Sequence, residues 1–105
     1  IFITWDDWGG WYDHVEPALL EKWSDGTQFR LGPRVGCLVL SPYAKAGYIS
    51  KKPKSHVSLI KFCESNYGLK SLNARTAAAG DMLDCFNFKQ KPAPPPNWKA
   101  AKAKQ

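Results

Sequence analysis

The sequence predicts an α/β fold built around a mostly parallel sheet. Residues 34–40 form a nearly continuous apolar run that closes at Ser41 and Pro42. Such runs are typical of strands buried on both faces, which occur in parallel sheets covered by helices. Residues 55–68 have the pattern of a helix with a capping residue at each end. Together the two segments favour a layered α/β architecture over a sandwich, which would show alternating polar and apolar residues.

The first element is a strand. Ile1 to Trp5 is rich in β-branched and aromatic residues, which predicts a buried strand that ends at Asp6 and Asp7. Gly9 and Gly10 then allow a sharp turn. Because the chain opens within this strand and without Met, we expect it to lack the N-terminal part of its domain.

A short helix is expected next. Glu16 and Pro17 suit a helix start, and Asp25 and Gly26 suit its end. The apolar run over residues 34–40 follows as the second strand. Residues 43–54 then contain Gly, Pro and a lysine cluster, which predicts an exposed loop in which Lys51, Lys52 and Lys54 contact either solvent or phosphate.

The most strongly marked helix begins after Ser55, which suits an N-cap, and ends at Gly68, which suits a left-handed C-terminal residue. Apolar residues recur between them at helical spacing: Leu59, Ile60, Cys63 and Tyr67. Residues 82–88 form a last apolar segment that we expect to pack onto the body.

The charge of the chain divides it into two regions. The formal net charge is +6, but residues 1–88 hold ten basic against nine acidic residues. Residues 89–105 hold five lysines and no acid, together with four prolines, which predicts a disordered tail. The tail lacks the interleaved aromatic residues of nucleic-acid-binding segments, so we expect no nucleic-acid partner. No segment approaches the roughly twenty apolar residues that span a bilayer, and no signal peptide is visible.

Asp6 and Asp7 are the first candidate site. They follow a strand, at the carboxyl end where open α/β sheets bind ligands. Two adjacent carboxylates repel each other unless a cation joins them, and their oxygens suit a divalent metal ion. The alternative is a pair of solvated turn residues.

His14 and His56 are the second candidates. His14 follows Asp13, whose carboxylate could orient the imidazole or raise its pKa for proton transfer. His56 stands in the first turn of the capped helix, where N–H groups favour a phosphate. The alternative, which the local pattern alone favours for both, is an ordinary surface histidine.

Four segments resemble the bacterial phosphoesterase family that includes phospholipase C and acid phosphatases. Residues 3–15, Ile-Thr-Trp-Asp-Asp-Trp-Gly-Gly-Trp-Tyr-Asp-His-Val, match a long and specific block of that family. Further matches cover residues 31–50 and 56–69, and a closing pattern lies at Arg75 and residues 81–86. Gly36 departs from the usual Pro, Glu16 stands in place of a Pro, and Lys54 and Ser55 precede His56 in place of an acidic residue.

The resemblance implies the C-terminal portion of an alkaline-phosphatase-like, three-layer fold over residues 1–88. It implies that Asp6 and Asp7 are metal ligands, and that His14 and His56 lie near the phosphate. The implied activity is metal-dependent hydrolysis of phosphate mono- or diesters, phospholipids included. The remaining ligands and the nucleophile belong to the N-terminal part of the domain, so we expect the isolated chain to be inactive. Relatives of this kind are often secreted or periplasmic.

A second reading of the chain is a non-catalytic remnant that serves as a binding or interaction module. The two readings differ in whether a segment carrying a nucleophile accompanies these residues.

Overall fold

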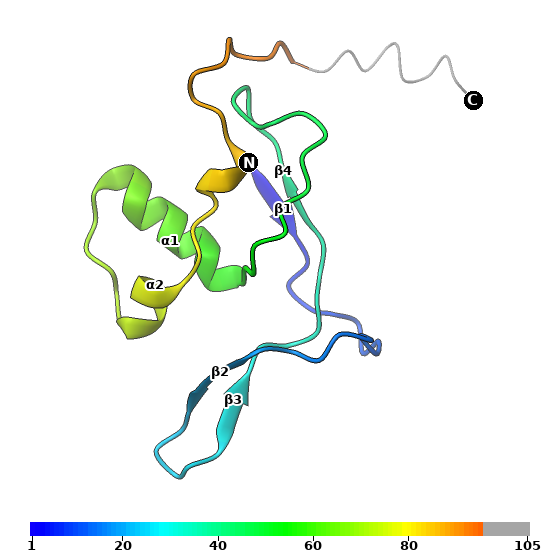
Figure 1. The fold of residues 1–105 in the computed structure, drawn as a ribbon, viewed down its shortest axis with the longest axis vertical. Helices are drawn as coiled ribbons and strands as arrows, with labels where there is room; N and C mark the ends of the chain where they lie inside the picture. Colours follow the sequence, from blue (N-terminus) through cyan, green and yellow to red (C-terminus); the bar gives the residue numbers. More distant parts are fainter. Residues whose placement is uncertain (96–105) are drawn as a thin grey trace.

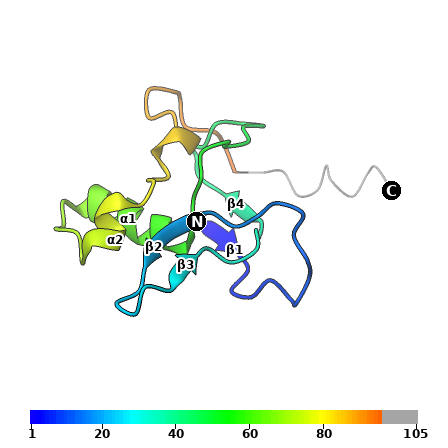
Figure 2. The ribbon, with the colours of Figure 1, turned by 60° about the horizontal axis from the view of Figure 1, so that its bottom comes forward.

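The computed structural model describes residues 1–95 and shows a mixed α/β arrangement (Figure 1). Two helices lie beside one small sheet, and a β-hairpin extends away from that sheet. With the hairpin end turned forward, the loop that joins the first two strands lies on the side opposite the helices (Figure 2). The elements, in chain order, are β1 (Phe2–Thr4), β2 (Leu19–Lys22), β3 (Gln28–Arg30), β4 (Cys37–Val39), α1 (His56–Tyr67), α2 (Ala74–Ala78) and the 3-10 helix η1 (Leu83–Cys85).

Strands β1 and β4 confirm the two predicted strands but pair in an antiparallel direction. Ile3 lies opposite Leu38 in their register, and β2 pairs with β3 in the same sense. The expectation of a parallel sheet is therefore wrong for the described residues. An apolar run indicates that both faces of a strand are buried, but it does not determine the direction of the neighbouring strand.

The outer face of the β1–β4 sheet is apolar and exposed. Side chains alternate between faces along a strand, so Phe2 and Val39 point towards the helices, where both pack against the core. The opposite face carries five large apolar residues that are 46–81% exposed: Ile1, Ile3, Trp5, Leu38 and Leu40. The burial on two sides expected for residues 34–40 is thus met on one side only.

The core lies where η1 packs between the sheet and α1. Met82, Cys85 and Phe86 are its buried members, which confirms that the last apolar segment packs onto the body. The ring of Phe86 stacks on Phe62 of α1 at 5.4 Å between centroids, and Phe2 of β1 meets Phe62 edge-on at 5.1 Å. These three rings join the sheet, α1 and η1 into one body.

Helix α1 has the ends that the sequence predicts. Ser55 is the N-cap residue, and its backbone N–H donates to the Ser58 hydroxyl at 3.0 Å. Gly68 adopts a left-handed conformation with φ of 63°, and its N–H donates to the Glu64 carbonyl. A side chain at such a φ is strained, which is why glycine ends the helix here.

A buried glutamate holds the connection between α1 and α2. Glu64 accepts hydrogen bonds from the Leu72 backbone N–H at 2.9 Å and from the Ser71 hydroxyl at 3.0 Å. These bonds, the one from Leu72 above all, lower the pKa of Glu64. At the far end of the connection, Asn73 caps α2 by accepting from the Thr76 N–H at 3.0 Å.

The short helix expected from Glu16 to Gly26 is wrong, because residues 19–30 form the β2–β3 hairpin. Gly26 has a φ of 85° and makes the turn, so the Asp-Gly pair that suited a helix end is a hairpin turn. Cross-strand contacts stabilise the hairpin: Trp23 meets Phe29 edge-on at 5.1 Å. Arg75 of α2 lies over the Phe29 ring at 4.3 Å and forms an ion pair with Glu21.

Hydrogen bonds continue beyond Phe88, in the segment that the sequence predicts to be a disordered tail. The Gln90 side chain donates to the Pro42 carbonyl at 3.0 Å, and the Ala93 N–H donates to the same carbonyl at 2.8 Å. The rest of the predicted tail, from residue 96 on, lies outside the described residues. Within the part of the chain that is described, neither helix has the length and apolar character needed to cross a bilayer.

Candidate metal and phosphate site

Asp6 and Asp7 lie directly beyond the end of β1, as predicted, and both are exposed. One oxygen of Asp7 accepts a hydrogen bond from the Gly9 N–H at 3.1 Å, which fixes the tight turn that follows. Gly9 and Gly10 both have positive φ, near 71° and 76°, so the chain reverses immediately after the two carboxylates. Within residues 1–95, neither carboxylate forms an ion pair.

His56 is brought to the same end of β1. Its Nε2 atom lies 2.9 Å from the carbonyl oxygen of Trp5, the residue before Asp6. A carbonyl can only accept, so Nε2 carries the proton in this bond and Nδ1 is left as the free nitrogen in the neutral form. The first residue of α1 is therefore held by the backbone carbonyl of the residue that precedes Asp6. This carbonyl is the partner of His56, and the two residues before the histidine, Lys54 and Ser55, carry no carboxylate.

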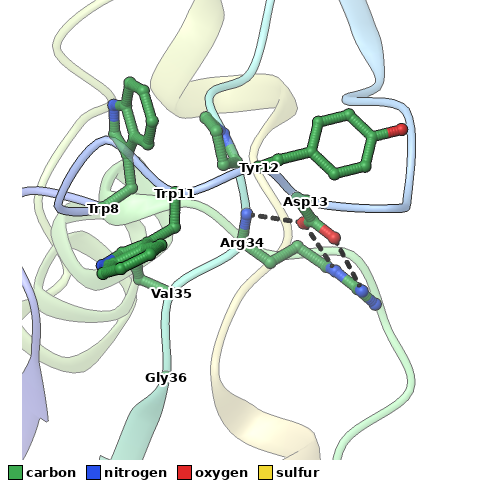
Figure 3. Close-up of a pocket in the computed structure, with 8 residues that line it drawn as sticks. Trp8, Trp11, Tyr12, Asp13, Arg34, Val35 and Gly36 are labelled. Atoms are coloured by element: carbon green, nitrogen blue, oxygen red, sulfur yellow. Dashed lines mark hydrogen bonds and ion pairs between the residues drawn. The ribbon is translucent and has the colours of Figure 1, made fainter.

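His14 is placed differently. Its side chain is 84% exposed, and its Nδ1 lies 3.8 Å from the nearer Asp13 oxygen. The Asp13 carboxylate, which was expected to orient His14, forms its hydrogen bonds with Arg34 instead (Figure 3). The Arg34 guanidinium donates twice to Asp13 at 2.9 Å, and the Arg34 and Val15 backbone N–H groups donate as well, at 2.9 and 3.0 Å. Sequence reasoning missed this pair, since no spacing links residues 13 and 34.

The Asp13–Arg34 pair gives a pH dependence that can be measured. The Arg34 side chain, followed by the backbone bonds, holds the pKa of Asp13 well below its usual range. A lowered pKa means that the stabilisation is present above the unfolded value of about 4 and is lost as the pH falls below it. We expect Arg34→Gln to lower the melting temperature at pH 7, and we expect the difference from wild type to shrink between about pH 4 and pH 2.

Thermal melts of both proteins followed by tryptophan fluorescence measure this difference. Lys70→Gln, which removes an exposed cation outside this pair, is the matched control and should melt like wild type at each pH. A difference for Arg34→Gln that stays constant down to pH 2 would contradict the proposed coupling.

A second ionic centre lies between η1 and the lysine loop. Asp84 accepts from the hydroxyls of Ser50 and Tyr48 at 2.5 and 3.1 Å, and Lys54 Nζ lies 2.7 Å from its other oxygen. Burial opposes ionisation of Asp84, but Lys54 and the two hydroxyls outweigh it and hold the pKa of Asp84 well below its usual range. Lys54 is thus a structural partner, which leaves Lys51 and Lys52 as the exposed members of the predicted lysine cluster.

The structure therefore ties His56 to the Trp5 carbonyl at the end of β1 that Asp6 and Asp7 follow, while His14 lies on the loop held by Arg34. Two exposed carboxylates have the oxygen chemistry that a divalent cation requires, and they fit part of its coordination shell. Among residues 1–95, no three His, Cys, Asp or Glu side chains lie close enough to hold a metal ion together. The donor set of this chain thus fits a shared metal site rather than a self-contained one.

Two cavities adjoin these residues. The smaller, of about 430 Å³, lies by Trp8, Trp11 and the Asp13–Arg34 pair (Figure 3). The larger, of about 640 Å³, runs between the base of the hairpin and the lysine loop and reaches Thr4 and His56.

Comparison with known proteins identifies one family. A model of the Phosphoesterase family matches residues 1–70. A non-hemolytic phospholipase C of Burkholderia pseudomallei is 31% identical over 84% of this chain and 16% of its own length. Phospholipase C B of Mycobacterium tuberculosis is 30% identical over 92% of this chain and 22% of its own. The chain thus spans about a fifth or less of these relatives, and no solved structure shows a significant match.

Proposed function

Because this chain belongs to the Phosphoesterase family, we propose that it forms part of a metal-dependent hydrolase of phosphate esters. In this proposal residues 1–88 are the C-terminal part of an alkaline-phosphatase-like domain, and the β1–β4 sheet is one edge of its central layer. Asp6 and Asp7 are metal ligands, and His14 and His56 act on the phosphate. The relatives are named phospholipase C, which supports a phosphate diester, phospholipids included, as the substrate class.

The observation that carries this proposal is the bond between His56 and the Trp5 carbonyl, at 2.9 Å. It links the first residue of α1 to the residue that precedes Asp6, although 49 positions separate His56 from Asp7 in the sequence. Carboxylates that hold a cation and a histidine at a helix N-terminus are complementary to the two parts of a metal-bound phosphate.

The residues of this chain have distinct tasks in the proposed reaction. Asp6 and Asp7 hold a divalent cation, which when bound would withdraw charge from the phosphoryl oxygens. His56 offers its free Nδ1, or a second N–H when protonated, towards the substrate. Asp13 and Arg34 fix the loop that carries His14, the second imidazole of the proposal. The nucleophile and the remaining metal ligands come from outside these residues.

A chimera tests the proposal. Residues 1–88 replace the matching stretch of phospholipase C B of Mycobacterium tuberculosis, which supplies the remainder of the protein. We expect the chimera to hydrolyse p-nitrophenylphosphorylcholine, to lose this activity in a chelator and to regain it with added divalent metal. The 105-residue chain by itself should give no turnover above background.

The control for the chimera is the same relative with its own stretch restored by the same cloning junctions. If that control is active and the folded chimera is inactive at all metal concentrations, these residues do not support catalysis. That result would favour the non-catalytic binding module.

A further inference from the structure

The pairing of β1 with β4 ends just before the residues of the candidate site. The last residue pair is Thr4 opposite Cys37, so Trp5, Asp6 and Asp7 lie beyond it. Backbone beyond the last pair of a sheet opens easily unless other contacts hold it. The position of the two carboxylates therefore depends on contacts outside the strand pairing.

Gly36, the residue before β4, supplies two such contacts. The Thr4 hydroxyl donates a hydrogen bond to the Gly36 carbonyl at 2.8 Å. The Trp5 side chain points to the opposite face of the strand, and its ring packs against Gly36. A Cβ atom on Gly36 would lie 2.8 Å from Cζ3 of this ring, so a side chain here would displace it. Gly36 thus holds the end of β1 on both of its faces.

The same short segment holds the far end of the loop that carries the carboxylates. The backbone N–H and the guanidinium of Arg34 donate three hydrogen bonds to Asp13 at 2.9 Å (Figure 3). Residues 34–36 therefore anchor the loop of residues 5–13 at its beginning and at its end. A loop that is fixed at both ends presents the side chains between them in a restricted set of positions.

We propose that Thr4 is a positioning residue for the candidate site and acts through the Gly36 carbonyl. The inference rests on the proposed function and deepens it, since Thr4 would hold in place groups that meet the metal and the phosphate. The residue after Thr4 is Trp5, whose carbonyl binds His56 at 2.9 Å, and the two carboxylates follow. Loss of the Thr4 hydroxyl should therefore loosen His56 and both carboxylates together.

Nuclear magnetic resonance on the purified 105-residue chain in a chelator tests this without metal or turnover. Thr4→Val keeps the branched shape and the strand preference of the side chain but removes the hydroxyl. We expect the backbone order parameters of Asp6 and Asp7 to fall from about 0.85 to about 0.6 or less. The ring of His56 should become as mobile as that of His14, whose side chain is 84% exposed and serves as the internal reference.

Two further variants control this measurement. Thr4→Ser keeps the hydroxyl and should restore the order of His56 and of both carboxylates. Thr27→Val is the matched control, because it removes a hydroxyl that bonds to Asp25 in the hairpin turn. It should leave the candidate site as ordered as in wild type. Unchanged order parameters in Thr4→Val, or an equal loosening of the site in Thr27→Val, would overturn the inference.

The chimera gives a second reading. Thr4→Val should lower its kcat about tenfold and change its KM less than about twofold, because the variant misplaces groups of the site without removing any. Thr4→Ser should keep the wild-type kcat. A wild-type kcat in Thr4→Val, despite a loosened site, would show that the anchor does not serve catalysis, and the inference would fail.

The two measurements separate this inference from the proposed function. If the chimera hydrolyses phosphate esters but Thr4→Val leaves the site ordered, the proposed function stands and Thr4 has no positioning role. If Thr4→Val loosens the site but the wild-type chimera is inactive, the anchor stands and the proposed function fails.

Discussion

Replacing Asp7 by Asn in the active chimera is expected to lower its metal-dependent kcat/KM by about 100-fold or more. Asn keeps the shape of the side chain but removes the negative charge that a divalent cation requires. Asp6→Asn should have an effect of the same order, because Asp6 follows the same strand and is exposed as well. The measurement is turnover across a titration of divalent metal, which should show a higher metal requirement in both variants.

Asp25→Asn is the matched control, since Asp25 is an exposed carboxylate in the hairpin turn, where it accepts hydrogen bonds from Thr27. The chimera carrying it should keep its full turnover. If Asp6→Asn and Asp7→Asn both keep wild-type turnover and metal dependence, the two carboxylates are solvated turn residues and the metal assignment is wrong.

Replacing Asp84 by Ala should have the largest effect on stability, about 3–5 kcal/mol, because it leaves Lys54 without a counter-charge. The Lys54 side chain is only 15% exposed, so water cannot replace the lost partner well. Proteins of this size are stable by about 5–15 kcal/mol, so the variant should lose a large fraction of its free energy of unfolding. Urea unfolding followed by circular dichroism measures the loss.

The double variant Asp84→Ala with Lys54→Met separates the ion pair from the packing around it. Replacing both members of a buried pair by apolar groups costs far less than removing one, so the double variant should recover a large part of the lost stability. If the single variant is as stable as wild type, or if the double variant is less stable than the single, the ion pair does not stabilise the fold.

The sequence predicts those elements whose signals are local. Helix α1 was predicted with both of its ends, because Ser55 and Gly68 act through backbone geometry within a few residues of themselves. Strands β1 and β4 were predicted from their composition. The direction of their pairing was not, because it depends on the path of the residues that connect the two strands. The position of Asp6 and Asp7 followed from the end of β1 in the same way.

The hairpin was missed for a different reason. Asp25 and Gly26 suit both a helix end and a hairpin turn, and the contacts that decide between them are not local. Trp23 meets Phe29 across the hairpin, and Arg75 reaches it from α2. At the candidate site, Arg34 and the Trp5 carbonyl partner of His56 were missed likewise, since each is joined to its partner only by the folded chain.

The buried carboxylate of Glu64 has a consequence for how this protein can vary. Connections between helices usually tolerate insertions, because their backbone bonds mainly to water. Here Glu64 accepts hydrogen bonds from Ser71 and Leu72, and Asn73 caps α2. Hydrogen bonds at both ends therefore fix the length of the connection. A single added residue between Gly68 and Asn73 would withdraw at least one donor from an ionised, buried oxygen. Length changes in evolution should therefore be tolerated at the hairpin turn and excluded here, although both segments look like ordinary loops.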